Sequence, residues 1–201
     1  MRVKTEARRM AYIQTAGKLF LQHGFSAVSM EAIAAQTGGS KVTLYNYFSS
    51  KEALFEAFVI EAGREAVNRL LEVPLIIGDV RTVLTELGMA YLRLITTPNV
   101  IALDRLIIGE AGRQPELAGI FYKNGYKRTI SVLVSVIENL IKTDQLHQGK
   151  PEIVAMHFKG LCEAGIFERF LWGLDIPNDD ELEKGVQGAV EAFIEGYGAK
   201  T

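Results

Sequence analysis

The stretch SKVTLYNYFSSK, which begins at Ser40, combines residue types that can contact both the edges of bases and a charged backbone. Each residue of a helix turns the chain by about 100°, so Leu44 and Phe48 share one side. Val42 and Asn46 then lie on the opposite side. An amide beside a branched apolar side chain is unusual on a surface that meets only water. In the major groove of DNA, the amide can pair with adenine and the valine methyls can contact the thymine methyl.

The residues around this outward side could contact phosphates. Thr43 and Tyr45 flank it, and the hydroxyls of Tyr45 and Tyr47 would lie where the flanking phosphates run. Lys51, in the first turn of the next predicted helix, would add a charge beside free backbone N–H groups. The alternatives for single residues stay open: either tyrosine could pack half-buried, Asn46 could cap the helix, and Lys51 could be solvated.

The elements before this stretch predict a helix-turn-helix. A first helix is expected from about Thr5, a good N-cap, to His23, with Gly24 as its stop. Ser29 would cap a second, short helix, which the TGGS turn ends. The third helix begins at Ser40, another good N-cap, and ends near Phe48. Two short helices joined by a glycine-containing turn, behind a longer one, are the layout of this motif.

The rest of the chain also has helical periodicity, with apolar residues three and four apart and five prolines in all. A fourth helix should open with a capping box of Ser49 and Glu52 and run toward Leu71. Further helices are expected over residues 79–97, 99–112, 115–142 with an interruption near 125, 151–173, and from 179 onward. We therefore predict an all-α protein, with a three-helix DNA-binding domain at residues 1–50 and a larger helical effector-binding and dimerisation domain at residues 51–201.

The segment TGGSKVTLYNYFSSKEALFEAFV, with AGKLFLQHGFSAVSMEAIA before it, resembles the DNA-binding region of the tetracycline-repressor (TetR) family. The resemblance implies a dimeric bacterial repressor whose C-terminal domain binds a small effector. It assigns DNA contacts by position to Ser29, Lys41, Val42, Thr43, Tyr45, Asn46, Tyr47 and Lys51, to which the capping residue Ser40 is added. Three positions depart from the family pattern. Gly39 replaces a frequent Val, Val42 a small residue or Pro, and Tyr47 a frequent His.

A second segment, LDRLIIGEAGRQPELAGIFYKNG, resembles the AefR-like type of effector domain in the same family. Pockets for small molecules are mostly apolar with few polar groups, so polar residues within the apolar helices are the candidates for effector binding. These candidates are Tyr91, Arg105, Tyr122, His157 and Glu163. As alternatives, Arg105 could pair with Glu110 inside the protein, and His157 could be an ordinary surface histidine.

The last two predicted helices favour a homodimer. The segment from Ile153 to Trp172 is apolar on most sides, so one face can meet the domain core and another a partner subunit. We expect a four-helix dimer bundle with a two-fold axis, which would place two recognition helices about 34–36 Å apart on a palindrome. The predicted interface residues are Phe167, Phe170, Leu171, Val186, Val190 and Phe193.

The charge distribution supports a DNA-binding N-terminal end. Residues 1–51 hold seven basic and two acidic side chains, whereas the rest holds 15 basic and 22 acidic ones. A basic end before an acidic body is typical of a protein that seeks a polyanion.

Composition and motifs also argue against several classes of protein. The single Cys162 excludes an intramolecular disulfide and, with no secretory signal and no long apolar run, indicates a cytoplasmic protein without a membrane span. The three histidines lack the spacing of a metal site, and no phosphate-binding loop follows a strand, so we expect no metal, cofactor or enzymatic activity. The remaining alternative is a constitutive DNA-binding dimer without small-molecule control.

Overall fold

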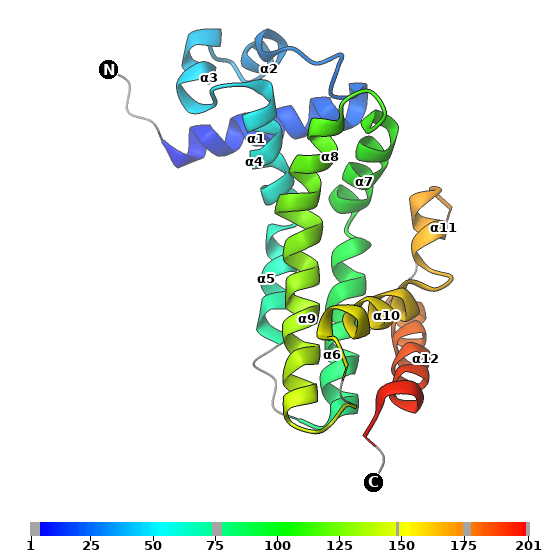
Figure 1. The fold of residues 1–201 in the computed structure, drawn as a ribbon. Helices are drawn as coiled ribbons and strands as arrows, with labels where there is room; N and C mark the ends of the chain where they lie inside the picture. Colours follow the sequence, from blue (N-terminus) through cyan, green and yellow to red (C-terminus); the bar gives the residue numbers. More distant parts are fainter. Residues whose placement is uncertain (1–4, 74–77, 148, 175–177, 200–201) are drawn as a thin grey trace. The chain divides into compact units, whose positions relative to one another are not determined.

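The computed structural model of the chain describes residues 5–73, 78–147, 149–174 and 178–199 (Figure 1). Within these ranges the regular elements are helices, apart from an isolated antiparallel bridge between Leu146 and Gly198. The all-α prediction is therefore confirmed. The helices are α1 (Glu6–His23), α2 (Met30–Gln36), α3 (Lys41–Tyr47), α4 (Lys51–Ala62), α5 (Arg64–Glu72), α6 (Val80–Ile95), α7 (Pro98–Glu110), α8 (Pro115–Phe121), α9 (Lys127–Lys142), α10 (Pro151–Glu163), α11 (Phe167–Leu171) and α12 (Asp179–Tyr197).

The chain forms two compact units that differ from the predicted division after residue 50. The first unit holds the described residues up to Ala62 and also Ala102–Gly125, whereas the second holds Gly63–Ile101 and the described residues from Tyr126 onward. The later segment belongs to the first unit because Leu103, Ile107 and Leu117 are buried in the same apolar core as α1 and α4.

The first unit is built as its capping residues predict. Thr5, Ser29 and Ser40 each accept a hydrogen bond from the backbone N–H three residues further on, so all three predicted N-caps are confirmed. Gly24 ends α1 with a φ of 80°, a conformation that glycine adopts without strain. Behind these helices, the rings of Phe20, Phe25 and Phe55 are buried together, with centroids 5.2–5.7 Å apart.

Two expectations for the fourth helix were wrong. Its first turn is capped by Ser50, whose Oγ accepts the N–H of Ala53 at 3.1 Å, rather than by a box of Ser49 and Glu52. The helix also does not run on to Leu71. It ends at Ala62, and Gly63, with φ −105° and ψ 1°, separates it from α5. The exposed N–H groups of a helix start can take either of two adjacent serines as a cap, which sequence alone does not distinguish.

Later helix boundaries agree in part. Pro115 stands at the start of α8, and the interruption expected near Gly125 is a π-helical turn, Tyr122–Tyr126, between α8 and α9. α7 already begins at Pro98, so Asn99 lies inside it. The helix expected from Pro151 to Gly173 is divided, because Gly165 adopts a φ of 73° between α10 and α11. The linker residues 74–77 lie outside the described residues.

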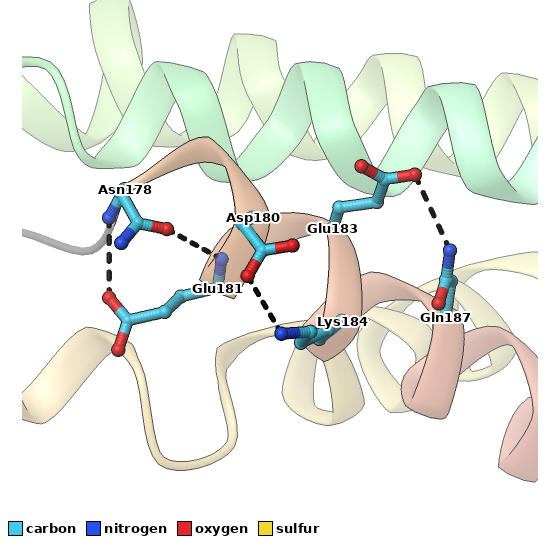
Figure 2. Close-up of polar contacts among 6 residues, drawn as sticks. All are labelled: Asn178, Asp180, Glu181, Glu183, Lys184 and Gln187. Carbon is cyan, nitrogen blue, oxygen red and sulfur yellow. Dashed lines mark hydrogen bonds and ion pairs between the residues drawn. The ribbon is translucent and has the colours of Figure 1, made fainter.

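The second unit packs α10 against α9 and α12, and α12 also against α6 (Figure 1). α12 begins with a capping box, in which Asn178 and Glu181 bond to each other's backbone N–H, and continues with the ion pair of Lys184 and Asp180 (Figure 2). No helix among the described residues is long and apolar enough to cross a membrane.

Four of the six predicted interface residues are buried within their own chain. Val186, Val190 and Phe193 of α12 are at most 1% exposed, because their stripe faces the core of their own subunit. Phe170 is also buried, at 3% exposure. This burial counts against a contact of these side chains with a partner. Phe167 and Leu171 remain partly exposed, and their place in an interface stays a prediction.

Candidate nucleic-acid interface

Helix α3 presents to the surface the side that its sequence indicates. Leu44 is 0% and Phe48 5% exposed, both within the core of the first unit, whereas Val42 is 72% and Tyr45 42% exposed. Asn46 is exposed as well. A largely exposed valine beside an amide thus forms the outer side of this helix. That this side contacts bases stays a prediction.

The start of α3 is fixed by hydroxyls and by an ion pair with α2. The Oγ of Ser40 accepts the N–H of Thr43 at 3.1 Å and lies 2.9 Å from the Thr43 hydroxyl. The Lys41 ammonium pairs with the Glu31 carboxylate and lies 5.8 Å from the centre of the Tyr45 ring. The hydrogen bond with Glu31 raises the pKa of Lys41. Glu31 was not among the predicted site residues, and its place near the start of α2 is the only signal for it in the sequence.

Tyr47 connects the end of α3 to the start of α1. Its hydroxyl accepts the N–H of Thr5 at 3.0 Å, and its ring centre lies 5.6 Å from that of Tyr12. The side chain of Tyr47 is partly buried, as the alternative of a half-buried packing residue expects. A phosphate contact through its hydroxyl stays a prediction.

The turn before α3 is filled by two side chains of α1. The guanidinium of Arg8 donates to the carbonyl of Gly38 at 2.9 Å. A Cβ at Gly39 would overlap the Tyr12 hydroxyl and would lie 2.6 Å from Nη2 of Arg8. The glycine that departs from the family pattern is therefore matched by large side chains on α1, and the turn is closely packed.

Lys51 is directed at the loop between α1 and α2. Its ammonium donates to the carbonyls of Phe25 and Val28, both at 2.9 Å, and lies 4.2 Å from the centre of the Phe25 ring. Partial burial lowers its pKa, while nearby Glu52 and Glu110 act in the opposite direction. Lys51 thus has a structural function in this unit, and the predicted phosphate clamp would have to act beside these two bonds.

An open cleft of about 440 Å³ lies beside these residues. Ser29, Glu31, Tyr45 and Lys51 all contribute to its lining, together with the loop before α2. Tertiary structure therefore gathers three predicted DNA contacts, Ser29, Tyr45 and Lys51, on one surface with Glu31. That surface mixes hydroxyls, the ammonium of Lys51 and the carboxylates of Glu31 and Glu52.

The predicted effector residues are divided between the two units. In the second unit, the buried Tyr91 donates to Glu163 at 2.5 Å, and Lys159 donates to the other oxygen of Glu163 at 2.6 Å. Burial, followed by the charge of Glu163, raises the pKa of Tyr91. His157, also in this unit, is exposed and contacts the Tyr197 hydroxyl.

Arg105 and Tyr122 belong to the first unit and are exposed, Tyr122 at 57%. The structure therefore brings Tyr91 and Glu163 together within the second unit. Among the described residues, no group of three His, Cys, Asp or Glu side chains could hold a metal ion.

Comparison with known proteins identifies the family. Residues 13–58 match the family described as "Bacterial regulatory proteins, tetR family", and residues 82–199 match that described as "AefR-like transcriptional repressor, C-terminal domain". The chain belongs to the TetR family. It is a transcriptional regulator with a DNA-binding domain, as both resemblances in the sequence implied. The names of both matched families describe regulators rather than enzymes.

Individual relatives extend the comparison. The transcriptional regulator UidR of Escherichia coli K12 is 33% identical over 72 residues, which are 36% of this chain and 37% of UidR. The repressor ComR of the same organism is 45% identical over 49 residues, 24% of this chain and 23% of ComR. The chain therefore aligns with little more than a third of UidR and with less than a quarter of ComR.

Two solved structures resemble the whole fold. A TetR-family regulator from Mesorhizobium loti has a TM-score of 0.85 and 26% identity, with 98% of this chain and 100% of that chain covered. The flavonoid-responsive regulator FrrA has a TM-score of 0.82 and 28% identity at the same coverage.

Proposed function

We propose that this TetR-family regulator is a repressor that binds a palindromic operator as a homodimer and is released by a small, largely apolar effector. The observation that carries the proposal is the outer side of α3, where Val42 is 72% exposed beside Asn46 while Leu44 behind them is fully buried. A helix of this kind fits the major groove, in which an amide can pair with adenine.

The exposed side of α10 supports dimerisation. Ile153 is 50%, Met156 39% and Leu161 37% exposed, all on one helix of the second unit. The neighbouring α12 exposes the small residues Gly188, Ala192 and Gly196 at intervals of four, which would let a second helix approach closely. Two-fold packing of these helices would bury the exposed apolar side chains and give the isologous contact of most homodimers.

The polar cluster of Tyr91, Lys159 and Glu163 supports effector binding by the second unit. Tyr91 and Lys159 both donate to Glu163 among apolar helices, and an effector with one polar group could exchange partners with them. FrrA, by its name, responds to flavonoids, which are largely apolar aromatic molecules with hydroxyls. An effector would release DNA only to the extent that it binds the DNA-free state of the repressor more tightly than the DNA-binding state.

The test is to recover the DNA that the purified protein retains from fragments of its own genome and to sequence it. The proposal expects enrichment of a few fragments that share an inverted repeat. Asn46→Ala should relax base preference at one position of each half-site, with a loss of about 1–3 kcal/mol on the retained sequence. Exposed Gln36→Ala, outside α3, is the matched control. Retention of no fragment above background would refute operator binding.

The effector step is tested on the fragment recovered above. Small apolar compounds, beginning with flavonoids, are added while binding is followed by fluorescence anisotropy. Release by one class, weakened by Tyr91→Phe, supports ligand control. If the protein stays bound to the operator in the presence of every class of compound, the alternative of a constitutive DNA-binding dimer is favoured.

A further inference from the structure

The loop Gly24–Val28, which leads from α1 into the Ser29 cap of α2, is held by side chains from two other parts of the first unit. Lys51 of α4 donates to its carbonyls at Phe25 and Val28, both at 2.9 Å. Ser29 directly after it caps α2 through the N–H of Ala32 at 3.1 Å. The position of this loop therefore sets the position of two predicted DNA contacts, Ser29 and Lys51.

The second support comes from the end of α7. Glu110 is only 8% exposed, which is unusual for a carboxylate. Its Oε2 accepts the hydroxyl of Ser26 at 3.3 Å, and the Ser26 hydroxyl accepts the side-chain amide of Gln114 at 2.6 Å. The carboxylate also approaches the backbone, since a Cβ at Gly24 would lie 3.1 Å from Oε1. Glu110 and Gln114 thus contact the loop through Ser26 and Gly24.

Charge connects the two supports. The carboxylate of Glu110 attracts the ammonium of Lys51, which is directed at the same loop. A buried carboxylate is costly unless hydrogen bonds and an opposite charge compensate it. Moving Glu110 away from Ser26 would leave the carboxylate with less compensation and would withdraw an attraction from Lys51. The loop Gly24–Val28 is therefore held between these two opposite charges.

We propose that Glu110 is a positioning residue for DNA binding, which acts through Ser26 and the loop Gly24–Val28 on Ser29 and Lys51. The inference rests on the proposed function. Glu110 and Gln114 lie in the stretch that matches the AefR-like C-terminal domain, yet they pack in the same compact unit as the helix-turn-helix. A shift of α7 and α8 would reach the DNA-binding surface by this route without any contact between Glu110 and DNA.

The experiment compares Glu110→Gln, Ser26→Ala and the double variant in the full-length protein. Glu116→Gln is the control, because it removes a carboxylate from the exposed surface of α8 in the same unit. Each protein is titrated with the genomic fragment that the wild type retains and with a 30-bp duplex of scrambled sequence. Thermal unfolding is measured in parallel.

Glu110→Gln and Ser26→Ala should each weaken binding to the retained fragment by about 3- to 10-fold, as expected for contacts within one hydrogen-bond network. The double variant should lose no more than the worse single variant, since both changes remove the same connection. Binding to the scrambled duplex should change less, because it depends mainly on charge and tolerates imprecise positioning. Glu116→Gln should bind both duplexes as the wild type does.

Unchanged affinity of Glu110→Gln for the retained fragment would overturn the inference, while operator binding by the wild type would still stand. An additive loss in the double variant would overturn it as well, because it would show that Glu110 and Ser26 act independently. A loss that follows the thermal midpoint across all variants would also overturn it, because it would indicate general destabilisation. If the wild type retains no fragment, the proposed function itself fails.

Discussion

At the scale of single residues, side-chain direction on α3 followed from sequence, whereas bonding partners did not. Val42 and Asn46 point outward and Leu44 inward, as a helical turn of about 100° per residue requires. Lys51 and Tyr47, by contrast, bond to backbone groups of residues 23 to 42 positions away. Such contacts leave no periodic signal in the sequence.

Gly39 should resist substitution because of Tyr12. Gly39→Ala would press its methyl against the Tyr12 hydroxyl and Arg8, and should destabilise the protein by about 1–3 kcal/mol, as overpacking usually does. The Tyr12 hydroxyl is buried without a hydrogen-bond partner among the described residues, so Tyr12→Phe should cost little and should reduce the penalty of Gly39→Ala. Urea unfolding of the two single variants and the double variant measures this coupling. An equal penalty in both backgrounds would contradict the assigned contact.

Cys162 should be unreactive in the folded protein. It is 1% exposed, and burial raises the pKa of its thiol to about 12, so little thiolate forms near neutral pH. Iodoacetamide at pH 8 should alkylate it slowly in the native state and rapidly in 6 M guanidinium chloride. Mass spectrometry of the intact protein gives both rates. Rapid native labelling would show that the second unit opens locally.

At the scale of elements, caps and glycines located most helix starts and missed two helix ends. Thr5, Ser29, Ser40 and Pro115 stand where predicted. The breaks at Gly63 and Gly165 were missed because an isolated glycine inside a helical pattern is often tolerated. Whether such a glycine ends the helix depends on how the segments before and after it pack against the rest of the protein.

Asp79, the N-cap of α6, should make the thermal stability of the protein depend on pH in the acid range. Hydrogen bonds from the backbone and side chain of Thr82 lower the pKa of Asp79 below its ordinary 3.8. The unfolded state has the ordinary pKa, so this stabilisation is complete above about pH 4 and is lost as the pH falls through the lower folded value. Asp79→Asn, which can still cap, should flatten this part of the profile.

Thermal midpoints between pH 6 and pH 2 measure the effect. Glu86→Gln, on the exposed surface of the same helix, is the control. An identical acid profile for Asp79→Asn and the wild type would contradict the role of Asp79.

At the scale of the whole molecule, periodicity showed that α12 has an apolar stripe without showing what covers it. Val186, Val190 and Phe193 lie in the core of their own subunit, where α12 packs on α6 and α10. For the dimer that we propose, this leaves the exposed side of α10 as the surface for a partner. Polar and small residues of α12 lie beside it.

A charge on this surface of α10 should weaken the proposed dimer. Leu161→Glu would place a carboxylate in an apolar interface, where desolvation is costly, and should weaken self-association at least about tenfold. Leu71→Glu, at an exposed leucine of α5, is the control. Sedimentation velocity over a concentration series measures the effect. A stable Leu161→Glu dimer would place the interface elsewhere.

Sequence by itself determined the helical class, the helix-turn-helix layout, the outward side of α3 and the family, because these depend on local periodicity, capping and short motifs. Tertiary structure decided which stripe of α12 is core, why Gly39 is glycine, and that Glu110 bonds to the loop before α2. The reason is physical. Periodicity shows that a side chain will be buried or exposed, whereas its partner is set by packing between segments such as Ser26 and Glu110, 84 positions apart.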